Sequence, residues 1–240
     1  MPAGFLSVND SNTVQIDENY FNLVLTRAGT TPRIGTGHSA YYRIPVTDNR
    51  TIIAFRPSAD GNTGVRFIGT TVVSGTRYYN YRVWHVTNGY NLIANLQYYM
   101  FSPIDGPGAN FGMQVFNEDE ELVYDATRFP CKPIHFYGPG LLSSASTTGR
   151  INTSLGSGRT YAVVPADCAW TEDFDGTDWG YTAQSYSGVY ASGYSRLVFV
   201  AEGITNGDPG FSGFPGGAYH IVVGYVMDLV IDVTNCPTTF

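Results

Sequence analysis

The chain has 240 residues, of which 43% are apolar and only 14% charged, a balance typical of a globular protein with a packed core. Gly (28) and Tyr (18) are abundant and Lys132 is the single lysine, which favours strands and turns over helices. The formal net charge is −7, and the absence of Lys and Arg clusters argues against a nucleic-acid-binding protein.

One stretch occurs twice, at residues 4–17 and 112–125, and the two copies align without a gap at an offset of 108. Four aligned pairs are identical: Gly4/Gly112, Asn9/Asn117, Asp17/Asp125 and Phe21/Phe129. Each copy has a short apolar run, a polar turn opened by Asn and a second run closed by Asp, which predicts a β-hairpin. An Asn side chain suits this turn because it can bond the backbone two residues further on. Two copies in one register indicate a tandem duplication.

The remainder of the first half predicts short strands separated by turn signals such as Asn88-Gly89. These strands are expected at residues 21–25, 41–46, 51–55, 65–68, 70–73, 78–86 and 92–101. Residues 102–109 are dense in Pro and Gly and predict a linker. The sequence therefore predicts an all-β protein of two tandem β-sandwich domains, residues 1–105 and residues 106–240.

The second domain is expected to repeat the first, since Ala54/Ala162 and Pro57/Pro165 keep the offset of 108. Its strands are predicted at residues 122–124, 134–137, 161–164, 197–201, 219–223 and 226–233. Residues 168–195 and 205–217 have no counterpart in the first half and are rich in Gly, Ser and Pro. They are predicted to be long loops.

The first of these loops carries six aromatic residues that make it a candidate partner interface. They are Trp170, Trp179, Tyr181, Tyr186, Tyr190 and Tyr194. Tyr and Trp give large contact areas at low entropic cost, while Ser and Gly let a loop adapt, as in antibody loops. The alternative is a loop that folds its rings back onto its own domain, and the sequence leaves both interpretations open.

Charge is unevenly distributed between the two halves. Residues 1–105 hold eight Arg against six acidic residues, whereas residues 106–240 hold five basic and fourteen acidic residues. The acidic run at 118–121 is expected at the tip of the second hairpin, where water screens adjacent carboxylates. An acidic second half serves solubility, or it meets a basic partner or the basic end of a neighbouring copy.

No arrangement of residues predicts catalysis or a bound cofactor. His38, His85, His135 and His220 lack metal-ligand spacing, and no nucleophile elbow, zinc-protease motif or phosphate-binding loop occurs. Residues 173–178 loosely resemble a calcium loop, but without its downstream Glu a polar turn is favoured. We therefore expect a protein that is not an enzyme, with no catalytic, cofactor-binding or metal-binding residues.

Cysteine usage and hydropathy bear on the compartment. Cys131, Cys168 and Cys236 are odd in number and far apart, so free thiols are expected rather than a disulfide framework. The sequence has no basic and apolar leader of the signal-peptide kind. The longest apolar stretch, 221–233, is interrupted by Gly224, Asp228 and Asp232, so membrane insertion is not expected.

The second hairpin also carries a family resemblance. The run Phe111-Gly112-Met113-Gln114-Val115-Phe116-Asn117, followed by Leu122-Val123-Tyr124-Asp125, resembles a recurrent pattern of small tail-tip and baseplate virion proteins of long-tailed bacteriophages. Residues 98–101 and 158–162 are also similar to that group, and the match spans about residues 95–165. The first copy departs from the pattern, with Leu6 in place of Gln114 and Ser7 in place of Val115.

The resemblance implies a structural protein of a phage tail tip or baseplate, made in the host cytoplasm and located in the virion. Its expected partners are other tail proteins, such as the hub, tube or fibre, and further copies of itself. The alternative function is a receptor- or glycan-binding module of the tail that uses the aromatic segment at 170–194. The family supplies no catalytic residues.

Overall fold

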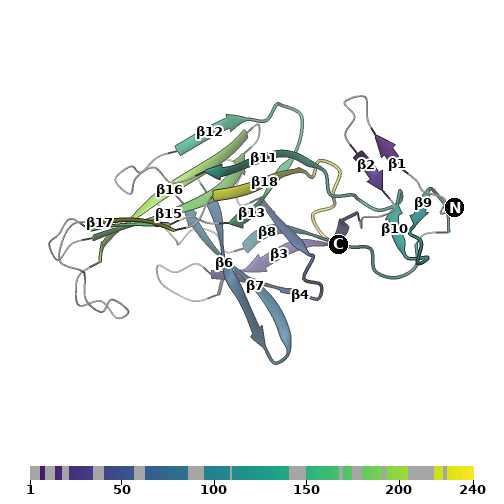
Figure 1. The fold of residues 1–240 in the computed structure, drawn as a ribbon, viewed down its shortest axis with the longest axis horizontal. Coiled ribbons are helices and arrows are strands. Elements are labelled where there is room, and N and C mark those ends of the chain that lie inside the picture. The colour runs from purple at the N-terminus through teal and green to yellow at the C-terminus, as the bar shows by residue number, and fades with distance from the viewer. Residues whose placement is uncertain are drawn as a thin grey trace.

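The computed structural model contains eighteen β-strands and no helix in the residues that it describes (Figure 1). The described residues are 6–8, 14–17, 22–34, 41–56, 63–85, 95–108, 110–140, 150–167, 170–174, 180–190, 193–204, 219–223 and 226–240. The all-β class predicted from composition is therefore confirmed for this part of the chain.

The strands are distributed over both halves of the chain. In the first half they are β1 (Leu6–Val8), β2 (Val14–Asp17), β3 (Val24–Pro32), β4 (Tyr41–Val46), β5 (Ile52–Arg56), β6 (Thr63–Val73), β7 (Thr76–His85) and β8 (Asn95–Ser102). In the second half they are β9 (Gln114–Phe116), β10 (Leu122–Asp125), β11 (Pro133–Gly140), β12 (Arg150–Ser154), β13 (Tyr161–Asp167), β14 (Trp170–Phe174), β15 (Gly180–Tyr190), β16 (Gly193–Ile204), β17 (Tyr219–Val223) and β18 (Val226–Asp232).

Both copies of the repeated stretch form antiparallel two-stranded hairpins, β1–β2 and β9–β10, as the sequence predicts. Their registers are identical after the shift of 108 residues. The first hairpin pairs Leu6 with Asp17, Ser7 with Ile16 and Val8 with Val14; the second pairs Gln114 with Asp125, Val115 with Tyr124 and Phe116 with Leu122. The register irregularity falls at the same place in both, so the sequence repeat is also a repeat of backbone geometry.

The remaining strands form two larger sheets whose strand orders are symmetric about their centres. The six-stranded sheet has the order β11-β18-β13-β5-β8-β3, and the eight-stranded sheet contains the path β12-β16-β15-β6-β7-β4. Reading inwards from the ends, each strand of the first half meets its counterpart from the second half. Strands β14 and β17 lie off this path and have no described counterpart in the first half.

The central pairs of the six-stranded sheet repeat residue by residue. Strand β5 pairs with β8 through Ile53–Met100, Ala54–Tyr99, Phe55–Tyr98 and Arg56–Gln97, and β13 pairs with β18 through Tyr161–Asp232, Ala162–Ile231, Val163–Val230 and Val164–Leu229. A shift of 108 residues relates β5 to β13, and a shift of 132 residues relates β8 to β18. The registers coincide, and the difference between the shifts reflects the extra segments that contain β14 and β17.

Equivalent residues also face one another where the two halves meet. Phe55 is paired with Val163, its own counterpart at the offset of 108, in antiparallel strands β5 and β13. In the other sheet Ser187 pairs with Val65, which brings the similar tripeptides at 63–65 and 187–189 together. Equivalent residues directly opposite each other in antiparallel strands define a local two-fold axis.

The second junction is built for close approach of two backbones. A Cβ atom at the buried Gly188 would lie 2.2 Å from the backbone oxygen of Thr63 and 3.6 Å from the Cα atom of Gly64. Any side chain here would therefore collide with the main chain of β6.

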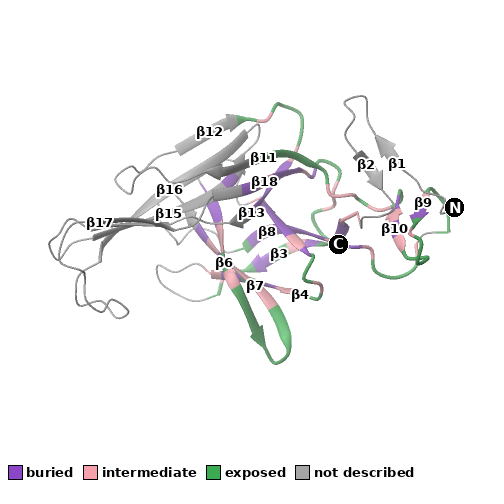
Figure 2. Cartoon of the chain, in the orientation of Figure 1, coloured by how far each residue is buried: buried purple, intermediate pink, exposed green. Residues whose placement is uncertain are grey.

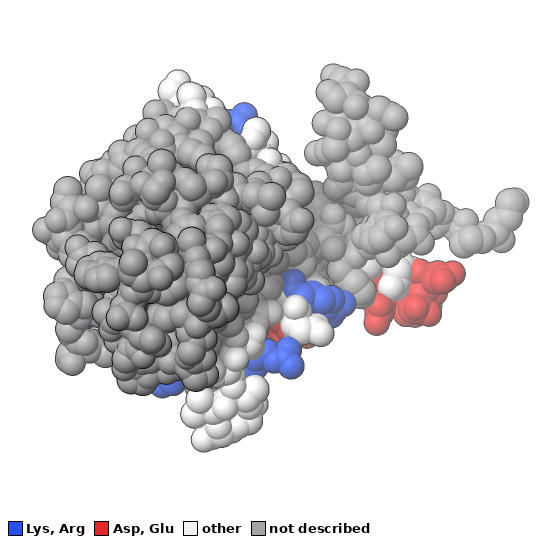
Figure 3. Space-filling model, turned by 60° about the vertical axis from the view of Figure 1, so that its left-hand side comes forward, with Lys and Arg blue, Asp and Glu red and all other residues white. Residues whose placement is uncertain are grey.

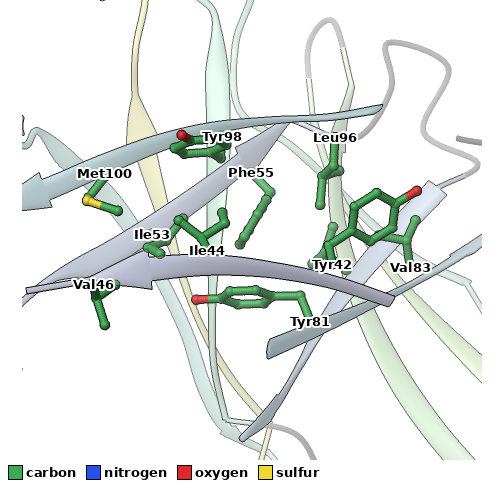
Figure 4. Packing of buried hydrophobic residues seen from close by; sticks show 11 residues of the cluster. Tyr42, Ile44, Val46, Ile53, Phe55, Tyr81, Val83, Leu96, Tyr98 and Met100 are labelled. Carbon is green, nitrogen blue, oxygen red and sulfur yellow. The ribbon is translucent and has the colours of Figure 1, made fainter. Parts of the chain in front are cut away.

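The largest described core cluster lies between the two sheets of the first half (Figure 4). It combines side chains from β5 and β8 with side chains from β4, β6 and β7, namely Tyr42, Ile44, Val46, Ile53, Phe55, Val65, Tyr81, Val83, Leu96, Tyr98 and Met100. The Phe55 and Tyr81 rings meet edge to face at 4.4 Å between centroids. Tyr161, Val163 and Val230 form a smaller described cluster at the matching place in the second half.

The opposite face of the six-stranded sheet is also buried and draws on both halves. Its cluster is made of Leu25, Ala28, Ala54, Tyr99, Phe101, Ala162, Val164, Ile231 and Val233. Ala54 and Ala162 are both fully buried there, so the aligned alanines are core positions in each copy. Two buried faces make this sheet the centre of the molecule, whereas the β6–β7 turn projects from the body and is exposed (Figure 2).

The expected division into separate domains at residues 105 and 106 does not describe the sheets. Both large sheets run continuously from the first half into the second through the β5–β13 and β6–β15 pairs. The linker composition at 102–109 marks where the repeat begins again, and it carries no information on which strand edges pair. The halves share their sheets instead of each closing its own.

Candidate functional site

The turn of the second hairpin is organised by Asn117. Its side-chain Oδ1 accepts hydrogen bonds from the backbone N–H of Asp119 at 3.1 Å and of Glu121 at 2.8 Å. Its Nδ2 donates to the Glu121 carboxylate at 2.9 Å, and Glu120 adopts a left-handed φ of 63°. The expectation that Asn opens this turn by bonding its own backbone is confirmed, and the turn holds a fixed shape.

The other end of the hairpin is closed by Asp125, which is 1% exposed. Its Oδ1 accepts from the Thr127 backbone N–H at 2.8 Å and from the Thr127 hydroxyl at 2.6 Å. Gly112 has a φ of 95°, a conformation that favours glycine, and a Cβ there would touch Thr127 Cγ2 at 3.1 Å. The spacing of Gly and Asp that the two copies share thus has a local structural cause in this copy.

Backbone hydrogen bonds connect the exits of the two hairpins. The Asn22 N–H donates to Val123 O at 3.1 Å, the Leu25 N–H to Phe129 O at 2.7 Å, and the Cys131 N–H to Leu23 O at 2.8 Å. Leu23 and Cys131 are again equivalent at the offset of 108. The second hairpin is therefore attached to the first half of the chain as well as to its own.

The second hairpin leaves large apolar side chains in solvent. Phe111 is 75% exposed, Phe116 50% and Met113 42%. The acidic residues 118–121 are exposed at the tip, so apolar and acidic surface lie on one projecting unit. In Figure 3 the Asp and Glu atoms gather on this projecting part, and the nearest Lys and Arg atoms lie on the body beside it. Rings exposed in this way beside a polar rim are typical of a protein–protein contact surface.

The aromatic segment is not the long loop that its composition predicts. Residues 170–174 form β14, residues 180–190 form β15, and residue 194 lies near the start of β16. These three strands are neighbours in one sheet, which places the backbones of five of the aromatic residues close together: Trp170, Tyr181, Tyr186, Tyr190 and Tyr194. Trp179 lies outside the described residues, as does the predicted loop at 205–217.

The physical reason for this correction is that pairing on both sides outweighs local composition. Strand β15 is bonded to β14 or β6 on one side and to β16 on the other. Ser and Gly are poor strand formers in isolation, but a central strand satisfies its backbone groups through its neighbours. Tyr and Thr within β15 are favourable strand residues and were the available signal.

Cysteine chemistry is muted in the described residues. Cys131 and Cys236 are free, as expected, and Cys168 lies outside the described residues. Burial raises the pKa of the Cys131 thiol to about 12, with a further contribution from neighbouring Cys236. Burial also raises the pKa of Cys236. Both side chains pack against the core cluster of the six-stranded sheet, which makes them small apolar groups and poor nucleophiles.

Metal ligands are not grouped in the part of the chain that is described. No three His, Cys, Asp or Glu residues there lie close enough together to hold an ion. Asp173 is part of β14, and residues 175–178 of the calcium-like stretch are outside the described ranges. His135 is an exposed residue of β11. Within the same ranges, no helix is long and apolar enough to cross a membrane.

Comparisons with known proteins give no family for this chain. No protein-family model matches it, no curated protein matches it, and no solved structure matches it. The function is therefore inferred from the residues and their geometry.

Sequence reasoning missed the exposed apolar side chains of the second hairpin as contact residues. The run 111–117 defines the hairpin by its pattern, and its apolar residues are those of an ordinary strand pair. The available signal was the number of large apolar residues in a two-stranded unit, which cannot bury both of its faces.

Proposed function

We propose that the protein is a structural component of the tail tip or baseplate of a long-tailed bacteriophage, located in the virion and assembled through protein–protein contacts. We further propose that the chain arose by tandem duplication and that its two large sheets pack as one β-sandwich shared by both copies. Its partners are other tail proteins, such as the hub, tube or fibre, and further copies of itself.

The observation that carries this proposal is the rigid second hairpin with its solvent-exposed rings. Asn117 and Asp125 fix both ends of the hairpin through side-chain hydrogen bonds, so little conformational entropy is lost when it binds. Phe111 and Phe116 are exposed on it without a described core to cover them. A preformed projection with apolar anchors suits permanent assembly better than transient capture of a small molecule.

The duplication is supported by coincident registers. Two hairpins and two central strand pairs repeat their pairing residue by residue, and equivalent residues Phe55 and Val163 face each other. The sandwich is supported by the core cluster that unites side chains of both sheets. A chain with internal two-fold symmetry offers related surfaces twice, which suits a symmetric assembly.

The direct test is quantitative mass spectrometry of purified phage particles. We expect the protein at a fixed stoichiometry relative to the tail tube, and antibodies against it should label one end of the tail. Absence from purified particles, or an amount that varies between preparations, contradicts the proposed function.

Variants then identify the contact. Replacing Phe111 and Phe116 together with Ser should prevent incorporation into tails while leaving the circular dichroism spectrum unchanged, because both rings are exposed. The matched control is Val72→Ser, a 67% exposed apolar residue on the β6–β7 hairpin, which should be incorporated normally. A parallel Trp179→Ala/Tyr181→Ala variant tests the aromatic segment as a second contact.

A further inference from the structure

The outer face of strands β4, β7 and β6 is basic. These strands contain four Arg, namely Arg43, Arg66, Arg77 and Arg82, and no Asp or Glu. Along β4 the buried Tyr42 and Ile44 point into the core, so Tyr41 and Arg43 between them belong to the opposite face. We call this opposite face, with Arg43, Arg66 and Arg82, the arginine face.

Two of these arginines stand directly opposite each other. Arg66 of β6 is paired with Arg82 of β7 in the antiparallel register. Like charges at opposed positions destabilise a sheet, and the Arg66 Nε atom is buried without a hydrogen-bond partner. An anionic group bound between the two strands would relieve both costs.

Tyrosines hold the neighbouring guanidinium groups in place. Arg82 donates a hydrogen bond to the Tyr41 hydroxyl and lies over the Tyr41 ring at 4.7 Å from its centroid. Arg43 lies over the Tyr78 ring at 5.1 Å. Stacked guanidinium groups are preorganised and keep N–H donors directed outwards, as in sites that recognise carboxylates.

The face is also hollowed. A cavity of about 320 Å³ lies beside Tyr41, Arg43 and Asn80. Its far wall is formed where β6 bulges between Phe67 and Gly69, and the φ of Gly69 is 129°. The cavity is large enough to receive the side chains of a tight turn.

We propose that the arginine face binds the acidic turn of a second copy of this chain, residues 117–121. This inference rests on the proposed function, because it names one of the contacts through which the protein assembles. The turn carries four consecutive exposed acidic residues, and Asn117 holds its backbone in a fixed shape. The aligned turn of the first hairpin, residues 9–13, carries one acid, so the two hairpin tips are not interchangeable.

The geometry makes this a contact between copies. The β9–β10 hairpin stands apart from strands β4, β6 and β7 in Figure 1. The cation that Glu121 influences within its own chain is Arg50, which already donates to Asp48 through two nitrogens at 2.8 and 3.1 Å. Two different surfaces joined head to tail are a heterologous contact, which produces a ring if the rotation closes and a filament if it does not.

The test is a charge exchange measured by sedimentation velocity at low and high salt. Wild-type protein should self-associate in a concentration-dependent way at low salt and dissociate at high salt. Glu118→Lys/Asp119→Lys and Arg43→Glu/Arg66→Glu should each weaken association by about tenfold or more. Mixing the two variants should restore it, because each then offers the complement of the other at both surfaces.

Controls separate this contact from general charge effects and from misfolding. Arg27→Glu/Arg128→Glu changes the same charge away from the arginine face and should associate like wild type. If Arg43→Glu/Arg66→Glu loses its circular dichroism spectrum, Arg43→Gln/Arg66→Gln removes the charge and keeps the length. A wild-type protein that stays monomeric, or a mixture that fails to associate, overturns the docking, whereas virion incorporation tests the proposed function separately.

Discussion

The two halves of the chain share one backbone plan and differ in what they add to it. Hairpin registers and the central β5–β8 and β13–β18 registers coincide. The differences lie in the acidic tip of the second hairpin, in the added strands β14 and β17, and in single positions such as Met100, whose counterpart by register is Asp232. Paired strands tolerate little change in register, because a slip of one residue moves every side chain to the other face.

The surface, by contrast, has diverged in charge. Strands β4, β6 and β7 of the first half gather arginines, while the second hairpin gathers carboxylates. A symmetric chain with identical surfaces favours two-fold pairing, and opposite charges on its two halves favour head-to-tail contact. The difference between the halves is therefore the part of the molecule that decides how copies meet.

The largest expected effect tests whether the halves are one folding unit. Phe55→Ala should lower the free energy of unfolding by about 4 kcal/mol, and Val163→Ala, its counterpart, by about 2 kcal/mol, since both are fully buried. Because they pair across the junction, each variant should shift one cooperative urea transition monitored by tryptophan fluorescence. Two separate transitions, of which each variant shifts only one, would show independent domains.

The next effect tests the other junction. Gly188→Ala brings a Cβ to 2.2 Å from the Thr63 backbone oxygen and should cost about 3 kcal/mol in urea unfolding. Gly29→Ala is the matched control, since its Cβ would meet only the Tyr98 side chain at 3.8 Å, an ordinary contact. If both substitutions are equally mild, the strands β6 and β15 do not approach as described.

A smaller effect compares the two hairpin turns. Asn117→Ala removes the acceptor for two backbone amides and should destabilise the turn by about 1–2 kcal/mol. The measurement is hydrogen exchange at the Asp119 and Glu121 amides, which should speed up while core amides stay protected. Asn117→Asp keeps the acceptor and should retain most of the protection. Asn9→Ala should act in the same way on the first hairpin if the two turns are equivalent.

The smallest effect concerns acid stability in the second half. Burial raises the pKa of Asp232, but hydrogen bonds from Thr234 and the charges of Arg159 and Lys132 outweigh it, so its pKa is lowered. The ionised carboxylate therefore stabilises the fold above the unfolded-state pKa of about 3.9, and this stabilisation is lost as the pH falls through the folded-state pKa. Asp232→Asn should flatten the fall in unfolding free energy below about pH 4 relative to wild type. An unchanged pH dependence would show that Asp232 gains nothing from these partners.

The sequence by itself determined the local structure of this protein. The Asn117 turn, the Asp125 closure and the left-handed Gly112 depend on contacts within a few residues, so their pattern predicts a hairpin. The all-β class followed in the same way, since strand and turn propensities act on short stretches. The offset of 108 between the copies also held in space, because equal local patterns give equal local registers.

Only the tertiary structure decided which strand edges meet. Phe55 reaches Val163 and Val65 reaches Ser187 across more than a hundred residues, and no local pattern encodes that choice. The same long-range pairing turned a Ser- and Gly-rich segment into the central strand β15, because neighbours on both sides satisfy its backbone. It also set Arg66 opposite Arg82, a juxtaposition that exists only because two strands pair in one particular register.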